Sequence, residues 1–247
     1  MPSKKVSEPP SPGGFSKKEA ISFGFNVAKK NFFYFISVFV VIIFINAFLN
    51  IFQVGLATQS QLGLSFVLAI AKIIFGVVIG MGLIKVALEF VDGQKPKIQD
   101  IFYTKSIVSY FLATLVTGIL SCAAALILIV PAVVLAVLIF SHLFNILTGL
   151  IVVILFLLCL VPVIILSIKL QFATYLIVDK SLGVSEALSK SWNMTKGIKL
   201  NLFLFAILLL LVNLLGILVV LAGLLVTIPL SMVALAYVYR KILSQAS

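Results

Sequence analysis

The chain is short of charge. Only 10% of its 247 residues are Asp, Glu, Lys or Arg, whereas about a quarter of an average soluble chain is charged. Apolar runs recur that are long enough to cross a hydrocarbon core of about 30 Å as helices. These runs lack the apolar and polar alternation that a membrane β-barrel needs. The composition argues against a soluble domain and predicts an all-α, polytopic transmembrane helix bundle.

Acids, histidine and cysteine are also scarce. The chain has seven acids, one histidine (His142) and two cysteines (Cys122 and Cys159). Both cysteines lie in apolar runs without metal-type spacing, which indicates small buried hydrophobic residues. No Gly-rich phosphate loop, nucleophile elbow or HExxH motif is present, and His142 falls in an expected turn far from every acid. We therefore expect no catalysis, metal or cofactor.

Positive charge is present but confined to part of the chain. Fifteen of the 18 Lys and Arg residues fall in four stretches: 1–31, 92–106, 179–199 and 240–247. The connections near 54–62, 141–144 and 216–221 carry no charged residue. Because basic loops stay cytoplasmic, this alternation predicts a cell-membrane protein with both termini in the cytoplasm. A net charge of +11 beside apolar spans favours anionic lipid headgroups as partners rather than nucleic acid.

We expect six spans. They lie near 32–53, 63–88, 107–140 and 145–178, with two more in 200–239 that break near Gly216–Gly223. The run 107–178 has room for two long or three short helices, and three would put the basic stretch 179–199 on the outer side. We therefore predict two, with a turn at Ser141–Asn145, and with tilt or kinks at Pro131 and Pro162 to absorb the excess length. Residues 1–14 are predicted to form a disordered cytoplasmic tail, and residues 15–247 a single membrane domain.

Two basic segments resemble each other. Residues 19–29 (EAISFGFNVAK) and 186–196 (EALSKSWNMTK) share five identities at an offset of 167. Residues 86–91 (VALEFV) similarly resemble residues 233–238 (VALAYV). These matches predict a parallel internal repeat with units of about 15–91 and 182–241. Each unit would comprise a short amphipathic helix, a span, an outer turn and a returning span.

Each short helix carries an apolar stripe backed by lysine. The stripes are Ile21, Phe25, Ala28 and Phe32 in the first copy, and Val184, Leu188, Trp192 and Thr195 in the second. Such a helix suits the plane of the membrane interface, and packing on the cytoplasmic end of the bundle explains the stripe equally well. In either case we expect contacts with lipid headgroups from Lys29, Lys30, Lys190, Trp192, Lys196 and Lys199.

The segment that begins at Tyr175 resembles a known family. Its hallmarks are Tyr175–Asp179, Glu186–Leu188, Ser191–Trp192 and Thr195–Gly197. They are similar to those of an uncharacterised prokaryotic family of multi-pass membrane domains related to the glycerophosphoryl diester phosphodiesterase membrane domain. The resemblance covers the C-terminal third closely and the remainder by the order of spans. It implies the membrane part of such proteins and not the phosphodiesterase.

Lys72 is the most informative polar residue inside a span. It lies about 14 Å into the second span, at 1.5 Å per residue, and no acid is available at that depth. Asn46 or Asn50 of the first span, or Asn213 of the fifth, could accept its hydrogen bonds. The simpler interpretation is a lysine that extends its ammonium group to the headgroups. Lys85 and Lys169, nearer the cytoplasmic ends, are expected to do the same.

These features favour a bacterial, non-catalytic membrane domain that interacts with lipids or acts as a scaffold. The alternative is a small transporter or permease subunit, which the parallel repeat and Lys72 suggest. The expected partners are membrane lipids with anionic headgroups. No protein partner can be named from the sequence.

Overall fold

The computed structural model describes residues 14–58, 61–141, 145–219 and 223–246. Within these ranges the chain is helical throughout apart from short connections, and it contains no strand. Almost all of the predicted tail 1–14, and His142, lie outside the described residues. In chain order the helices are α1 (Lys17–Lys30), α2 (Phe32–Thr58), α3 (Leu62–Val91), the 3-10 helix η1 (Ile98–Phe102), α4 (Ile107–Leu126), α5 (Ile129–Phe140), α6 (Ile146–Leu170), α7 (Ala173–Lys180), α8 (Val184–Met194), α9 (Lys199–Leu218) and α10 (Leu224–Ala246).

Six stretches of the described chain are long and apolar enough to cross a membrane. They are Phe32–Gly55, Gly63–Val91, Ile107–Phe140, Ile146–Lys180, Lys199–Leu218 and Leu224–Gln245. This confirms the all-α, polytopic fold class. The region 107–178 forms two of these stretches rather than three, as the charge pattern predicts.

The long third span is interrupted close to a proline. α4 ends at Leu126 and α5 begins at Ile129, which places Pro131 in the first turn of α5. The first turn of a helix tolerates proline, because its N–H groups have no intrahelical partner in any case. The predicted kink near Pro131 is therefore present as a short break just before it.

The fourth span is interrupted elsewhere than expected. α6 continues through Pro162 and ends at Leu170, and α7 begins at Ala173. At this break the Lys169 carbonyl accepts a hydrogen bond of 2.7 Å from the Ser191 hydroxyl of α8. A carbonyl four residues before Ala173 would normally accept from its N–H. Helix α6 therefore ends where α8 contacts it and not at Pro162.

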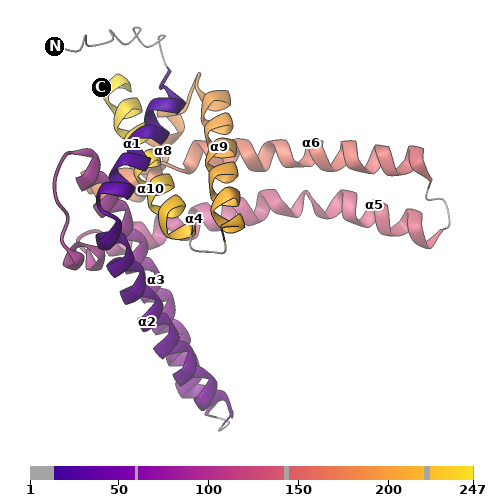
Figure 1. The fold of residues 1–247 in the computed structure, drawn as a ribbon. Helices are drawn as coiled ribbons and strands as arrows, with labels where there is room; N and C mark the ends of the chain where they lie inside the picture. Colours follow the sequence, from indigo (N-terminus) through magenta and orange to yellow (C-terminus); the bar gives the residue numbers. More distant parts are fainter. Residues whose placement is uncertain (1–13, 59–60, 142–144, 220–222, 247) are drawn as a thin grey trace.

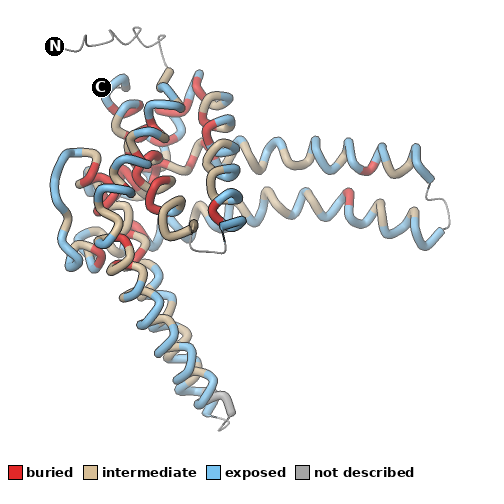
Figure 2. The backbone as a smooth tube through the Cα atoms, viewed as in Figure 1, coloured by how far each residue is buried: buried red, intermediate tan, exposed pale blue. Residues whose placement is uncertain are grey.

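The helices form a packed head from which two hairpins project (Figure 1). The head contains α1 and α7–α10 together with the adjoining ends of α3 and α4, and the hairpins α2–α3 and α4–α6 leave it in different directions. Buried residues gather in the head, whereas the hairpins are mostly exposed or half-buried (Figure 2). The largest fully buried side chains of the head include Phe172, Leu176, Ile177, Leu202, Phe205, Val238 and Tyr239.

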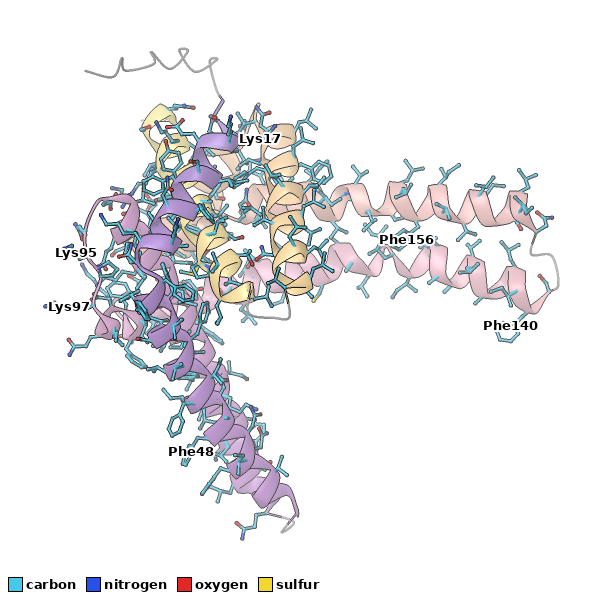
Figure 3. All side chains as sticks on the ribbon, in the orientation of Figure 1. Lys17, Phe48, Lys95, Lys97, Phe140 and Phe156 are labelled. Carbon is cyan, nitrogen blue, oxygen red and sulfur yellow. The ribbon has the colours of Figure 1, made fainter. Side chains whose placement is uncertain are left out.

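The projecting hairpins present large apolar side chains outward, while lysines lie on the head (Figure 3). Phe48 is 60% exposed and Phe140 is 84% exposed. Lys95 and Lys97 lie in the loop between α3 and η1, at the opposite end of the α2–α3 hairpin from its tip. Exposed apolar surface as extensive as that of these hairpins marks contact with lipid or with other apolar surfaces.

Helix α1 packs antiparallel along α10. Its N-cap, Ser16, accepts a hydrogen bond of 3.2 Å from the Glu19 N–H, as the Ser-x-x-Glu pattern leads one to expect. The Glu19 carboxylate accepts from the Tyr237 hydroxyl of α10. Further along, a Cβ built on Gly24 would lie 2.5 Å from the Leu230 carbonyl oxygen. The two helices approach this closely because residue 24 has no side chain.

The buried face of each short helix only partly follows the predicted stripe. It consists mainly of small residues, Ala20, Gly24 and Ala28 in α1 and Ala187, Ser191 and Thr195 with Met194 around α8, of which Ala28 and Thr195 belong to the predicted stripes. Phe25 is 46% exposed and Trp192 is 39% exposed. Small residues permit close helix packing, so each helix docks by this face and leaves its aromatic residue at the surface. Packing on the head is one of the two predicted settings, and a position in the membrane interface stays a prediction.

Candidate functional site

A lysine and a tryptophan meet where α6 ends against α8. The Lys169 ammonium lies 3.0 Å from the centroid of the Trp192 ring, within the range of a cation–π interaction. The Ser191 hydroxyl donates a hydrogen bond to the Lys169 carbonyl. Because Trp192 follows Ser191 in α8, this bond places the Trp192 ring beside the Lys169 side chain. Lys169 was expected to extend to the headgroups, and the structure places its ammonium on this ring.

The turn after α8 brings two more lysines near this contact. The buried Thr195 hydroxyl donates to the Ser191 and Trp192 carbonyls. Gly197 then takes a φ of 80°, a left-handed conformation that glycine adopts without strain. Lys196 and Lys199 flank this turn, and α9, which begins at Lys199, packs against α6, the helix that carries Lys169. The Thr195–Gly197 hallmark is therefore the element that ends α8 and turns the chain into α9.

We call Lys169, Trp192, Lys196 and Lys199 the basic corner. Within the described chain none of its three lysines has an acidic partner within ion-pair distance. Three ammonium groups without a nearby counter-charge repel one another and attract anions. Lys190, the other predicted contact on α8, instead lines a shallow surface depression together with Glu186 and Asn193.

Lys29 and Lys30 occupy the last turn of α1 and are both exposed. They line a second surface hollow with Phe25, Phe32, Phe33 and Val226. All of these residues except Val226 come from the α1–α2 junction, and Val226 comes from the first turn of α10. The structure thus surrounds these two predicted contacts with apolar side chains.

Lys72 has amide partners within its own hairpin. Its ammonium donates to Asn50 Oδ1 at 2.7 Å and to Gln53 Oε1 at 2.9 Å, both on α2. Asn50 was among the partners considered, and Gln53 was missed. Three positions separate the two amides, which places them on one helix face, so the spacing alone could have identified Gln53.

Of the alternative partners predicted for Lys72, Asn50 is found, and among the described residues Lys72 makes no hydrogen bond to Asn46 or Asn213. The Asn46 side chain donates to the Ile42 carbonyl of its own helix at 2.9 Å. The Asn213 side chain donates to Ser231 Oγ at 2.8 Å, within the α9–α10 hairpin. Asn213 belongs to the α9–α10 hairpin, which points in a different direction from the α2–α3 hairpin of Lys72 (Figure 1), whereas Asn46 lies on α2 one turn before Asn50.

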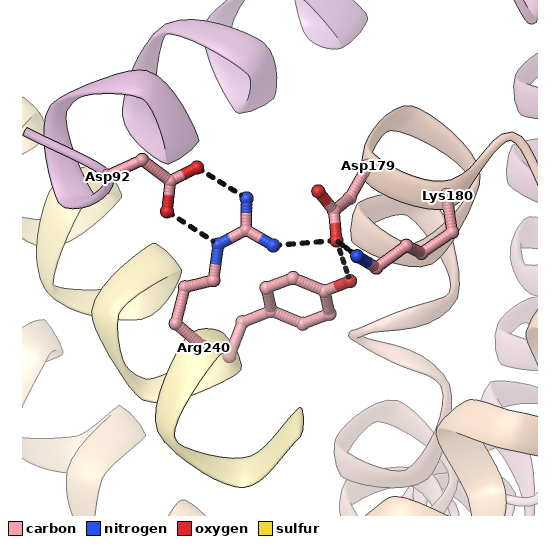
Figure 4. Close-up of polar contacts among 5 residues, drawn as sticks. Asp92, Asp179, Lys180 and Arg240 are labelled. Carbon is pink, nitrogen blue, oxygen red and sulfur yellow. Dashed lines mark hydrogen bonds and ion pairs between the residues drawn. The ribbon is translucent and has the colours of Figure 1, made fainter. Parts of the chain in front are cut away.

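A charged cluster that the sequence did not reveal lies where three hairpins meet (Figure 4). Arg240 of α10 donates from Nε and Nη2 to the two oxygens of Asp92, at 2.9 and 2.6 Å. Its Nη1 donates to Asp179 Oδ2 at 2.7 Å, and the Tyr239 hydroxyl donates to the same oxygen at 2.9 Å. Lys180 lies 3.6 Å from that oxygen. Asp92 follows α3 and Asp179 belongs to α7, so one guanidinium joins three elements.

One sequence signal for this cluster was available. Arg240 is the only arginine among 18 basic residues. A planar guanidinium binds a carboxylate through two parallel hydrogen bonds, which an ammonium group cannot do. A single arginine in a chain that otherwise uses lysine therefore marks a position where this fork is needed.

Other acids of the head are also paired. Lys85 lies 3.6 Å from Glu89 and 3.5 Å from Asp100, and its ammonium lies 4.5 Å from the Tyr103 ring centroid. These contacts hold η1 and the loop that follows it against α3, so Lys85 has protein partners instead of extending to the headgroups. No three His, Cys, Asp or Glu residues of the described ranges are grouped so as to hold a metal ion.

Comparison with known proteins yields one match. No curated protein and no solved structure matches the chain. The family match spans both predicted repeat units apart from most of α1, and it includes the basic corner, the Lys72 group and the Arg240 cluster. The chain belongs to the family described as "Protein of unknown function (DUF975)", which matches residues 26–246.

Proposed function

We propose that this protein is a non-catalytic, multi-pass protein of the cell membrane that binds anionic lipid headgroups, with both termini in the cytoplasm. The observation that carries the proposal is the basic corner, where Lys169 lies on the exposed Trp192 ring and Lys196 and Lys199 follow in the turn into α9, which packs on α6; none of the three lysines has an acidic partner in the described chain. A headgroup phosphate would supply the missing negative charge.

The setting of the corner supports a lipid ligand over a soluble anion. Lys169 lies in the last turn of α6, and Lys199 begins α9 and its apolar stretch. Lysine and tryptophan at the ends of apolar helices are typical of the headgroup region of a bilayer, and each basic residue near an anionic surface contributes about 1 kcal/mol of attraction. The resemblance to the glycerophosphoryl diester phosphodiesterase membrane domain is part of the same proposal, because its hallmarks include Trp192 and Lys196.

The transporter alternative receives less support. It depends on Lys72, whose ammonium already donates to two amide oxygens of α2. The hairpin that contains Lys72 projects from the head, and its outer part has only its own two helices side by side (Figure 1). Because two of its three N–H donors bind amides of the same hairpin, Lys72 is better explained as a packing contact between α2 and α3 than as part of a transport path.

The proposal can be tested with the chain's own fluorescence. Trp192 is the only tryptophan, so its emission reports on the basic corner alone. The full chain is placed in nanodiscs of phosphatidylcholine with a rising fraction of phosphatidylglycerol. We expect a saturable change in emission that is absent when phosphatidylcholine alone is present.

The matched pair of variants removes the same charge at two places. Lys196→Gln with Lys199→Gln should weaken the response at least tenfold while keeping Lys169 on the ring. Lys95→Gln with Lys97→Gln, in an exposed loop of the head, should leave it unchanged. Equal responses to both lipids, or equal loss in both variants, would rule out a headgroup site at the corner.

A further inference from the structure

The α1–α2 junction forms a hollow with two chemically different sides. α1 ends at Lys30 and α2 begins at Phe32, so lysines at the end of one helix are followed at once by phenylalanines at the start of the next. Asn31 occupies the junction, and its side chain donates to the Val27 carbonyl at 2.9 Å. The hollow is lined by Phe25, Lys29, Lys30, Phe32, Phe33 and Val226.

This hollow and the basic corner occupy corresponding places in the two predicted repeat units. At the offset of 167, Phe25 corresponds to Trp192 and Lys29 corresponds to Lys196. Residue 32 corresponds to residue 199, so the lysine at the start of α9 has a phenylalanine as its counterpart in α2. Both short helices bury their small-residue face and leave this aromatic and basic face free.

Each place is completed by a residue from another hairpin. Lys169 of α6 joins the corner through its contact with Trp192. Val226 of α10 joins the hollow. The corner therefore gains a third positive charge, whereas the hollow gains more apolar surface. The two places have the same arrangement of a short helix against another hairpin and differ in how much of their lining is charged.

The lining of the hollow selects the class of ligand. Lys29 and Lys30 have no acidic partner within ion-pair distance in the part of the chain that the structure describes, and two adjacent ammonium groups attract a phosphate as point charges. Three phenylalanines and a valine would gain nothing from a free inorganic anion. Phe33 is 82% exposed, and an acyl chain would cover such surface favourably.

We propose that this hollow is a second lipid site, which takes an anionic phospholipid with its phosphate on Lys29 and Lys30 and an acyl chain along the phenylalanines. The inference rests on the proposed function in that both sites take the same class of ligand. It goes further by assigning one site to each repeat unit, at the contact between a short helix and a span of another hairpin.

The test moves the single tryptophan from one site to the other. Phe25→Trp in a Trp192→Phe background places the only indole at the corresponding position of the hollow, where residue 25 is partly exposed and has room for it. In nanodiscs, a rising fraction of phosphatidylglycerol should change its emission, and phosphatidylglycerol with brominated acyl chains should quench it. Inorganic phosphate added to the detergent-solubilised protein should have no effect.

Charge removal then separates the two sites. In the chain with the moved tryptophan, Lys29→Gln with Lys30→Gln should weaken the response of the indole at position 25 at least tenfold. In the chain that keeps Trp192 and Phe25, the same two substitutions should leave the response of Trp192 intact. Lys196→Gln with Lys199→Gln should do the reverse. An emission change at position 25 that is the same in both lipids, or that survives loss of both lysines, would overturn the hollow as a site. A response to inorganic phosphate of equal size would overturn the lipid as its ligand.

The outcomes distinguish failure of the hollow from failure of the corner. If Trp192 responds and the indole at position 25 does not, only the second site is lost. If the indole at position 25 responds and Trp192 does not, the basic corner fails and the hollow stands. Native mass spectrometry of the otherwise native chain, before and after loss of Lys29 and Lys30, gives an independent reading without a moved tryptophan: we expect one fewer retained phosphatidylglycerol, and no change would contradict the site.

Discussion

Helices α1 and α8 bury the same positions but are anchored differently. Both have small buried residues at corresponding places: Ala20 and Ala187, Gly24 and Ser191, Ala28 and Thr195. At the central position, α1 has a glycine that lets the Leu230 backbone of α10 approach, whereas α8 has a serine that donates to a backbone carbonyl of α6. One surface pattern therefore serves two kinds of helix contact, a steric one and a polar one.

The difference shows how similar helices are directed to different partners. Gly24 has no side chain to form a hydrogen bond, so its contact with α10 depends only on the close approach of the Leu230 backbone. Ser191 offers a hydroxyl, and a carbonyl is free to accept it where α6 is interrupted. The repeat itself stays a prediction, but the matched burial at three pairs of positions is what a repeat would produce.

The largest effect should come from filling the gap at Gly24. Gly24→Leu forces a side chain against the Leu230 carbonyl, from which the Cβ alone would lie 2.5 Å, so we expect a cost at or above the upper end of the range of about 1–3 kcal/mol that is typical of overpacking. We expect a clear fall in the thermal unfolding temperature of the detergent-solubilised protein. Ser22→Leu, at an exposed position of the same helix, is the control and should change little. Equal stability of the two variants would show that α1 does not need its close approach to α10.

The next largest effect should come from the charged cluster that links α10 to both other hairpins. Arg240→Lys keeps the charge but cannot reproduce the paired hydrogen bonds to Asp92 together with the bond to Asp179. Because hydrogen bonds to charged groups contribute about 1.5–3 kcal/mol each, we expect a loss of about that size in the free energy of unfolding.

The neighbouring lysine provides a control for this change. Lys241→Arg, which also exchanges one basic group for the other, should have little effect, since Lys241 lies 4.0 Å from Glu19 and is about half exposed. If Arg240→Lys unfolds at the same temperature as this control, the cluster is not a structural link between the hairpins.

The smallest effect should come from the serine of α8. Ser191→Ala removes one hydrogen bond to the Lys169 carbonyl and should cost about 1 kcal/mol. It should also loosen the register of α8, so the Trp192 emission should change as the ring moves relative to Lys169. Ser189→Ala, at an exposed position of the same helix, should alter neither stability nor emission. An unchanged Trp192 spectrum in Ser191→Ala would mean that the ring is positioned without this bond.

Local patterns were reliable where one element or one turn decides the structure. The six spans follow from the length of apolar runs, and the division of 107–178 into two spans follows from the distribution of lysine. The Ser16 cap follows from its spacing to Glu19. The Lys72 partners were only half found, because Asn50 was considered and Gln53 was not, although both lie within a single hairpin.

Long-range contacts were beyond such patterns. Arg240 bonds residues 148 and 61 positions away, and nothing in the local sequence names Asp92 or Asp179. The predicted stripe of α1 included Phe25 but neither Ala20 nor Gly24, which are buried because close packing against the backbone of α10 favours small residues. Asn213 was considered as a hydrogen-bond partner of Lys72 because both were expected inside the membrane, although Asn213 lies in another hairpin.

The sequence by itself determined that this is an all-α membrane protein with six apolar stretches and basic connections, because the cost of placing charge and unpaired backbone in a bilayer acts on each segment separately. Only the tertiary structure decided which lysines remain without an acid. Whether a lysine or arginine meets an acid depends on which hairpin ends lie together in the head. There Arg240 meets Asp92 and Asp179, and Lys85 meets Glu89 and Asp100. The basic corner and the hollow at Lys29 are two of the charged places that have no acidic partner in the described chain.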